Sequence, residues 1–176
     1  ATDCTFITQA EIVAKCTVPK PLKLECTISF TFDKGRVERQ NTSIVPDGLF
    51  GVQYPNGKYS FFALEAEHYN PLKPNTLNRA SFLKKILAYR DIIKSGAYKK
   101  QLNIPNLRVL SVFPTKTRTQ HAKELVEEIA KTSNLFLMQD VPVQEELWKA
   151  PQPFPELFEA KWKRGGLVPV SIDIAV

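Results

Sequence analysis

Three acidic residues stand at the ends of two apolar runs that flank a predicted turn. Asp47 precedes the first run, and Glu65 and Glu67 close the second, with the turn at residues 54–58 between them. Carboxylate oxygens are the ligands that Mg²⁺ prefers, and three carboxylates crowded together repel one another unless a cation lies among them. The spacing therefore predicts a site for a divalent metal ion, if the turn brings the acids to one face of a sheet.

The chemistry of the turn decides which face the acids share. Pro55 suits the first corner of a type I turn and Gly57 the left-handed bulge residue, which together give a three-residue loop that pairs Asp47 with Glu65. A two-residue Asn-Gly turn would instead pair Asp47 with Ala66 and place Asp47 on the face opposite both glutamates. The first register is favoured, because Pro55 fits the type I corner well.

The helices and strands that must position these acids are predicted from the periodicity of apolar residues and from the Gly, Pro and capping residues at their ends. Their order is helix, strand, hairpin, helix, strand, helix, strand, at residues 8–16, 22–32, 45–67, 76–95, 107–113, 119–131 and 135–138. Residues 36–43 are interpreted as a polar stretch that leads into the hairpin. This order predicts an α/β protein, an α+β sandwich with a central mixed sheet flanked by helices.

The chain is expected to form one core domain with an appendage. Residues 1–140 are predicted to be the core, and residues 141–176 a proline-rich C-terminal extension packed on it, in which residues 167–176 add a final strand. Four of its prolines, Pro142, Pro151, Pro153 and Pro155, follow Asp140 closely.

Composition limits the classes of function that the chain can have. The chain has 176 residues and a formal charge of +6, which is compatible with a polyanionic partner. It has no apolar run of about 18 residues, so we expect no membrane-spanning segment. Its three cysteines lack paired metal spacing and its two histidines are few, which argues against a zinc site and for a reducing, cytoplasmic setting.

With the acids placed, the pattern resembles the core of PD-(D/E)xK phosphodiesterases, the restriction-endonuclease-like fold. That core runs helix, three antiparallel strands, helix, strand; Pro46 and Asp47 match the first half of the motif, and residues 65–67 the second. A closer resemblance is to replication-relaxation-type proteins of bacterial plasmids and mobile elements. Its segments are residues 6–12, 45–51, 61–67, 81–89 and 108–112, and it covers roughly residues 6–130. Fuller members of that group carry a winged helix ahead of this region.

The resemblance implies a role for each residue of the predicted site. Asp47 and Glu65 would bind Mg²⁺ or Mn²⁺, and Glu67, which stands where the motif has lysine, would be a further ligand. Lys85 on the next helix would replace the missing lysine as the third catalytic residue. Two supporting residues are Glu11 from the first helix and Tyr89, one turn beyond Lys85.

Each of these residues also has a simpler explanation. Glu11 completes a capping box with Thr8, and Lys85 can be a solvated charge at the helix edge. Asp47 suits a Pro-Asp-Gly turn, although turn chemistry alone does not explain why it faces Glu65. Tyr89 lies on the apolar stripe of its helix and is most simply a core residue.

The expected function is nuclease-like processing or binding of DNA in the replication or mobilisation of a plasmid or mobile element. Hydrolysis of phosphodiesters with Mg²⁺ is one form of it; the alternative is a catalytically inactive domain of the same fold that binds DNA or a protein partner. Weaker candidates for contacts to nucleic acid are Lys116 and Arg118, just past a strand, and Lys163 and Arg164, beside a tryptophan and two glycines.

Overall fold

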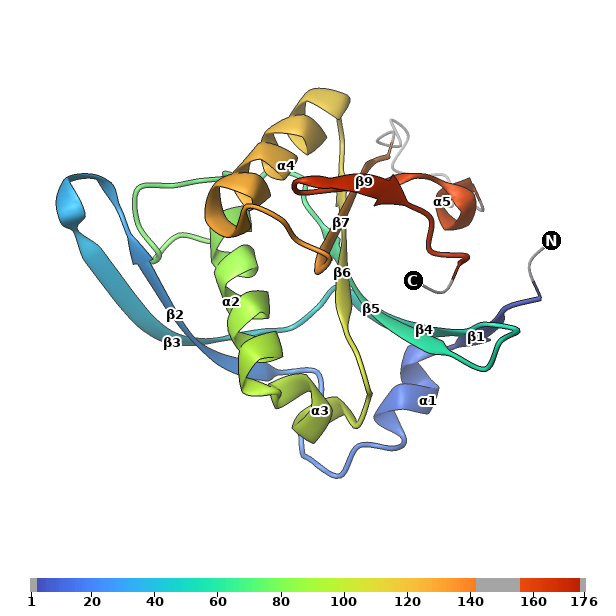
Figure 1. Cartoon of the computed structure of the whole chain (residues 1–176). Helices are drawn as coiled ribbons and strands as arrows, with labels where there is room; N and C mark the ends of the chain where they lie inside the picture. The colour runs from blue at the N-terminus through green and yellow to red at the C-terminus, as the bar shows by residue number, and fades with distance from the viewer. Residues whose placement is uncertain (1–2, 142–155, 175–176) are drawn as a thin grey trace, which may run out of the picture.

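The computed structural model describes residues 3–141 and 156–174, which form a mixed α/β structure around a seven-stranded sheet (Figure 1). The strand order is β1-β4-β5-β6-β7-β8-β9. The bounds of these strands are Thr5–Ile7, Gly48–Gln53, Tyr59–Ala66, Arg108–Phe113, Phe136–Asp140, Trp162–Arg164 and Leu167–Val170. A separate two-stranded sheet consists of β2 and β3, Leu24–Thr31 and Val37–Ile44.

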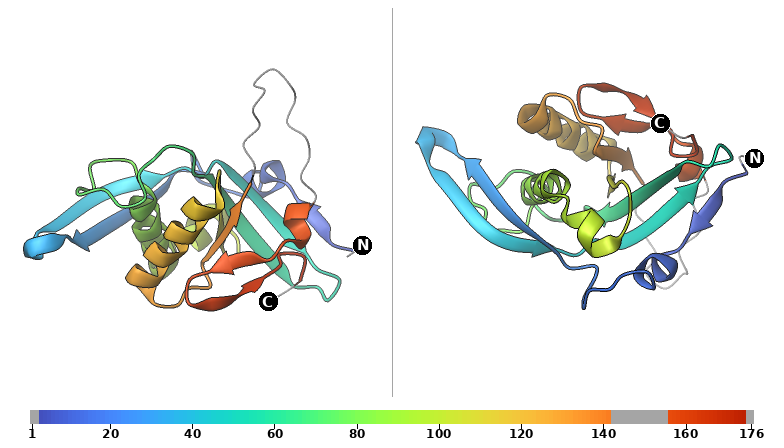
Figure 2. Two further views of the ribbon diagram at one scale, coloured as in Figure 1. Left: turned by 90° about the horizontal axis from the view of Figure 1, so that it is seen from above. Right: turned by 60° about the horizontal axis from the view of Figure 1, so that its bottom comes forward.

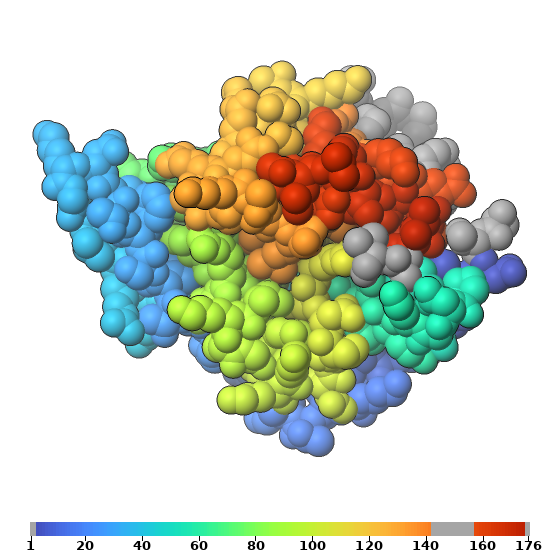
Figure 3. Space-filling view, in the orientation of Figure 1, coloured from blue at the N-terminus to red at the C-terminus, as the bar shows by residue number. Residues whose placement is uncertain are grey.

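The helices lie on and around this sheet. They are α1, α2, α3, α4 and α5, at Gln9–Val13, Phe82–Ser95, Ala97–Leu102, Lys116–Ala130 and Glu156–Glu159, with a 3-10 turn at Asp33–Gly35. The β2–β3 hairpin packs on α2 at one end and projects from the body at the other (Figures 2 and 3). Its inward residues Leu24, Cys26 and Ile28 are buried, so the predicted alternation of this strand is confirmed.

The main sheet has an apolar layer on each face. One layer lies under α2 and α4, where Phe82, Ile86 and Val126 meet residues of the central strands. The other layer contains Phe62, Leu110 and Leu137 together with Trp162 and Ile172 from the C-terminal part of the chain. The sheet is thus buried on both faces, which explains the continuous apolar run in β5.

The hairpin of β4 and β5 has the predicted three-residue register. Gly48 pairs with Leu64 and Gln53 with Tyr59, and the Tyr54 amide donates to the Lys58 carbonyl oxygen at 2.9 Å. Gly57 has φ +78°, as the left-handed bulge residue requires. Continuing this ladder by one step places Asp47 opposite Glu65.

Parallel pairing gathers several chain segments at one edge of the sheet. β5 pairs with β6 and β6 with β7 in parallel, so the carboxyl ends of these three strands meet there. The antiparallel β4 begins at the same edge. This C-terminal edge contains the end of β5, where the acidic residues lie, and crevices at such edges commonly bind ligands in α/β sheets.

Several predicted elements differ from the structure. The predicted strand of residues 22–32 lies outside the main sheet, and the polar stretch of residues 36–43 is largely strand β3. The helix predicted from residue 76 begins at Phe82, because Ser81 caps it, and residues before the cap are tied to Glu38 instead. The helix predicted from residue 119 begins at Lys116, after the Thr115 cap.

The C-terminal part of the described chain continues the main sheet. Met138 of β7 pairs with Lys163 of β8, and β9 lies where a final strand was predicted. Pro142, Pro151, Pro153 and Pro155 lie outside the described residues, whereas Pro169 lies in β9. Within residues 3–141 and 156–174, no helix is both long and apolar enough to cross a membrane.

Candidate functional site

Glu65 is the most deeply embedded acid of the predicted site. It lies in β5, is 1 % exposed, and faces α2. Its Oε1 accepts a hydrogen bond from the Tyr89 hydroxyl at 2.5 Å, and its Oε2 accepts one from the Lys85 ammonium at 2.6 Å. Burial raises the pKa of Glu65 above its ordinary value; Lys85 and Tyr89 oppose that rise, and nearby Asp47 adds to it.

Glu67 lies just past β5 and is also buried. Its amide donates to the Val112 carbonyl oxygen at 2.9 Å, which continues the pairing with β6 beyond the end of the strand. Its Oε1 lies 2.6 Å from the Lys85 ammonium, but both of its oxygens are buried and neither has a well-aligned hydrogen-bond partner among the described residues. A buried carboxylate oxygen without a partner is costly, and it commonly marks a group that binds something else.

Lys85 bridges the two glutamates from the first turns of α2. The Ser81 hydroxyl accepts a hydrogen bond from the Lys84 amide and fixes the start of this helix. Burial lowers the pKa of Lys85, but the carboxylates of Glu65 and Glu67 outweigh that effect and hold the pKa above its ordinary value. Lys85 is therefore a charged residue and not a solvated helix-edge lysine.

Asp47 is exposed and lies directly before β4. Its Oδ2 accepts a hydrogen bond from the Ala66 amide at 2.8 Å, so it caps the end of the hairpin ladder. No described hydrogen bond or ion pair joins Asp47 to Glu65, Glu67 or Lys85. We refer to Asp47, Glu65, Glu67 and Lys85 together as the acidic cluster.

The donor chemistry of the acidic cluster bears on its fit to a metal ion. The described residues contain no group of three or more His, Cys, Asp or Glu side chains placed to hold one, and the Lys85 ammonium contacts both glutamates. The donors are nevertheless all carboxylate oxygens, and neither Glu67 oxygen has a well-aligned hydrogen-bond partner among the described residues. Mg²⁺ needs only one or two carboxylates and keeps several waters, so this donor set fits Mg²⁺ or Mn²⁺.

Two cavities reach the acidic cluster. A cavity of about 270 Å³ is lined by Glu67, with His68, Phe113 and Pro114 around it. A second, of about 330 Å³, is lined by Lys85, with Lys84 and residues of β3. The half-buried Lys85 and the buried Glu67 therefore each line a cavity.

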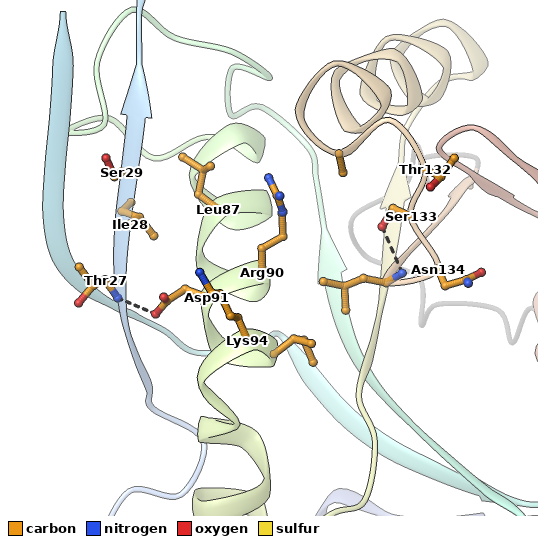
Figure 4. A pocket seen from close by; sticks show the side chains of 13 residues that line it. Thr27, Ile28, Ser29, Leu87, Arg90, Asp91, Lys94, Thr132, Ser133 and Asn134 are labelled. Carbon is orange, nitrogen blue, oxygen red and sulfur yellow. Dashed lines mark hydrogen bonds between the residues drawn. The ribbon is translucent and has the colours of Figure 1, made fainter.

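The hollow shown in Figure 4 lies elsewhere. Its volume is about 500 Å³, and it is enclosed by β2, α2 and residues 130–135. Asp91 points to β2 there and accepts a hydrogen bond from the Thr27 amide at 2.9 Å (Figure 4). None of the acidic cluster residues lines it.

The remaining predicted site residues are placed differently. Tyr89 joins the cluster through Glu65, as described above. The Glu11 carboxylate accepts a hydrogen bond from the Thr8 amide at 2.7 Å and completes the capping box. Among the described contacts, none links Glu11 to the cluster, so its capping role accounts for it.

The four candidate cations for nucleic acid lie on two elements. Lys116 is exposed and begins α4, and the Arg118 guanidinium donates to the Asn70 carbonyl oxygen. Lys163 lies 3.5 Å from Asp140, and Arg164 donates to the Asn134 side chain and the Val168 carbonyl oxygen. Three of the four are therefore tied to the protein, and Lys116 is left exposed at the helix terminus.

One residue near the cluster was missed from the sequence. Ser111 of β6 pairs with Glu65 and is fully buried, and within the described part of the chain its hydroxyl has no hydrogen-bond partner. The sequence signal that could have identified it is that Ser111 is the one hydroxyl residue in the largely apolar run of residues 107–113. Because paired residues point to the same face, Ser111 faces the same side of the sheet as Glu65.

Comparison of the chain with models of protein families, with curated proteins and with solved structures found no match. The function must therefore be inferred from the chemistry of the acidic cluster and its place in the fold.

Proposed function

We propose that this chain is a nuclease-like DNA-processing domain in which the acidic cluster supports metal-dependent phosphodiester hydrolysis, in the replication or mobilisation of a plasmid or mobile element. One observation carries the proposal: the Lys85 ammonium lies 2.6 Å from the Glu65 carboxylate. The motif lacks its lysine at position 67, and Lys85 supplies an ammonium at the acids from the following helix.

The order of elements supports a restriction-endonuclease-like core. Helix α1 is followed by the antiparallel strands β4 and β5, helix α2 and the parallel strand β6, with β1 on the outer side of β4. The β2–β3 hairpin is then an insertion between α1 and the strands that carry the acids.

The cluster residues have distinct roles in this proposal. Asp47 and Glu65 would hold Mg²⁺ or Mn²⁺ through oxygen ligands, with Glu67 as a further one. The chemistry that such an ion would supply is polarisation of the phosphate and a lower pKa of the attacking water. Lys85 stabilises negative charge that develops on the phosphate, and Tyr89 holds Glu65 in a fixed orientation.

DNA is the proposed substrate. Helix α4 begins just after β6 and therefore at the C-terminal edge, where its first amides and the exposed Lys116 favour a phosphate group. Three further cations add positive charge: Arg118, Lys163 and Arg164. Each of them already contacts the protein, so their donors are partly occupied before a phosphate group binds. The formal charge of +6 favours a polyanion in general.

A second candidate is a catalytically inactive domain of the same fold that binds DNA or a replication or mobilisation protein. One observation favours it: the Lys85 ammonium contacts both Glu65 and Glu67, so one of their two negative charges is compensated without a metal ion.

Nicking of supercoiled plasmid in Mg²⁺ or Mn²⁺ tests the proposal. Wild type is compared with Glu65→Ala and with Glu25→Ala, in which an exposed glutamate of β2 is removed as the matched control. Cleavage that Glu65→Ala abolishes and Glu25→Ala retains supports a nuclease. No cleavage by wild type, with plasmid binding that weakens steeply with salt and survives Asp47→Ala, supports the second candidate.

A further inference from the structure

We propose that Lys85 is a resident cation of the acidic cluster, which a divalent metal ion displaces from Glu67 when it binds. The inference rests on the proposed metal site and deepens it. In the metal-free protein the ammonium takes the place of the metal and holds two buried carboxylates together. In the metal-bound protein the same ammonium is released toward the cavity that Lys85 lines.

The contacts of Lys85 show why it acts as a substitute for a metal ion. Its ammonium lies 2.6 Å from Glu65 Oε2 and 2.6 Å from Glu67 Oε1. Both glutamates are 1 % exposed, and two buried carboxylates that contact the same ammonium repel each other when no cation lies between them. One ammonium compensates only one of the two negative charges.

The substitution is incomplete at Glu67. Both of its oxygens are buried and lack a well-aligned hydrogen-bond partner among the described residues, although the Lys85 ammonium lies 2.6 Å from Oε1. An ammonium has three donors in fixed directions, whereas a hydrated Mg²⁺ or Mn²⁺ presents up to six positions in its shell. A metal ion and its waters can therefore satisfy these oxygens, and Glu67 is among the residues that line a cavity of about 270 Å³.

The ammonium also has space to leave. Lys85 lines the second cavity, whose other residues include Thr42, Ser43 and Ser81, and its side chain is 21 % exposed. Its four-carbon stem is flexible, so the charge can move without a shift of the backbone. Helix α2 is held in place by its cap and by the fully buried Leu83 and Ile86.

Lys85 therefore has opposite effects on two properties: it weakens metal binding and it stabilises the metal-free protein. Removal of the Lys85 ammonium eliminates the competitor and tightens metal binding. It also leaves Glu65 and Glu67 without a shared cation, so the metal-free protein becomes less stable.

Calorimetric titration with Mn²⁺ tests this, with the melting temperature measured with and without Mn²⁺. The variants are Lys85→Met and, as a matched control, Lys84→Met. Lys84 lines the same cavity one residue away and has no described contact with an acid, so it measures the general effect of one lost charge. We expect Lys85→Met to bind Mn²⁺ on the order of tenfold tighter than wild type and Lys84→Met to stay within about twofold.

Without Mn²⁺, the melting temperature of Lys85→Met should be lower than that of wild type. Addition of Mn²⁺ should raise the melting temperature of Lys85→Met by more than it raises that of wild type. If wild type binds Mn²⁺ and Lys85→Met binds it no more tightly than Lys84→Met does, the displacement is wrong and the proposed metal site stands. If neither wild type nor any variant binds Mn²⁺, the proposed metal site fails and the displacement with it. Should Lys85→Met not fold without metal, Lys85→Gln, which retains a donor for one carboxylate, replaces it in the same comparison.

Discussion

The Tyr89 hydroxyl donates a hydrogen bond to Oε1 of Glu65 at a distance of 2.5 Å, and both residues are buried. This contact joins α2 to β5 beneath the acidic cluster. Because it occupies Oε1, it leaves Oε2 directed at Lys85 and so fixes which oxygen of Glu65 faces the rest of the cluster.

Tyr89→Phe should lower the free energy of unfolding by about 1–3 kcal/mol, because a buried carboxylate loses a hydrogen-bond donor. Urea denaturation of the variant and of wild type measures the difference. Tyr69→Phe is the control, since Tyr69 is 86 % exposed and its substitution should have almost no effect. Equal losses in the two variants would contradict the stabilising role of the Tyr89 hydroxyl.

Protonation of Glu65 at low pH should stabilise the folded state. Burial raises the pKa of Glu65 in the folded protein above its ordinary value of 4.5. At a pH between 4.5 and the raised pKa, the folded protein therefore binds a proton at Glu65 more readily than the unfolded chain does. The stability of wild type relative to Glu65→Gln, which cannot titrate, should therefore rise as pH falls through the raised pKa and level off near 4.5. Urea denaturation of both proteins from about pH 4 to pH 8 measures it. If the stability of wild type relative to Glu65→Gln instead grows with rising pH, the pKa of Glu65 is lowered on folding, and the effect of Lys85 on that pKa is larger than the effect of burial.

Gly57→Ala should destabilise the protein by about 1 kcal/mol, because an L side chain is strained at a positive φ. Gly57 has φ +78°, and no atom lies within 4 Å of an added Cβ, so the expected effect is conformational and not steric. Thermal unfolding measures it. Gly57→Asn should lose less, since asparagine tolerates the left-handed region better; a larger loss for Asn than for Ala would argue against this explanation.

Cys26 should react with iodoacetamide more slowly than Cys4 or Cys16 in the folded protein at about pH 8. Burial, with Asp91 and Glu25 nearby, raises the pKa of Cys26 to about 11, and only its thiolate is nucleophilic. Cys4 and Cys16 are half-buried. Peptide mass spectrometry after timed labelling separates the three sites. In urea the difference should disappear, and a difference that persists there would mean that folding is not its cause.

The features that depend on local chemistry could be predicted from the sequence. The hairpin register followed from Pro55 and Gly57, and the capping box from Thr8 and Glu11, because each motif is complete within a few residues. Lys85 was expected near Glu65 from the family resemblance. The contact itself depends on how α2 packs on β5, which no local pattern specifies.

Strand β3 and the burial of Glu67 could not be predicted for a different reason. Half of β3 faces solvent with residues such as Arg39 and Asn41, and its strand conformation comes from pairing with β2 along eight residue pairs. Glu67 lies beyond the end of β5 and is buried because β6 extends past it, as its hydrogen bond to Val112 shows. Both features are non-local.

The position of β8 beside β7 has a practical consequence for shortened forms of this protein. A chain cut after residue 140 would retain the acidic cluster but lose the strand that pairs with Met138 and the indole of Trp162 that covers Leu110 and Leu137. Its β7 would become an open edge next to exposed apolar surface, a combination that promotes intermolecular strand pairing and aggregation. Insolubility of such a fragment would then reflect an uncovered sheet and would reveal nothing about the chemistry of the acids.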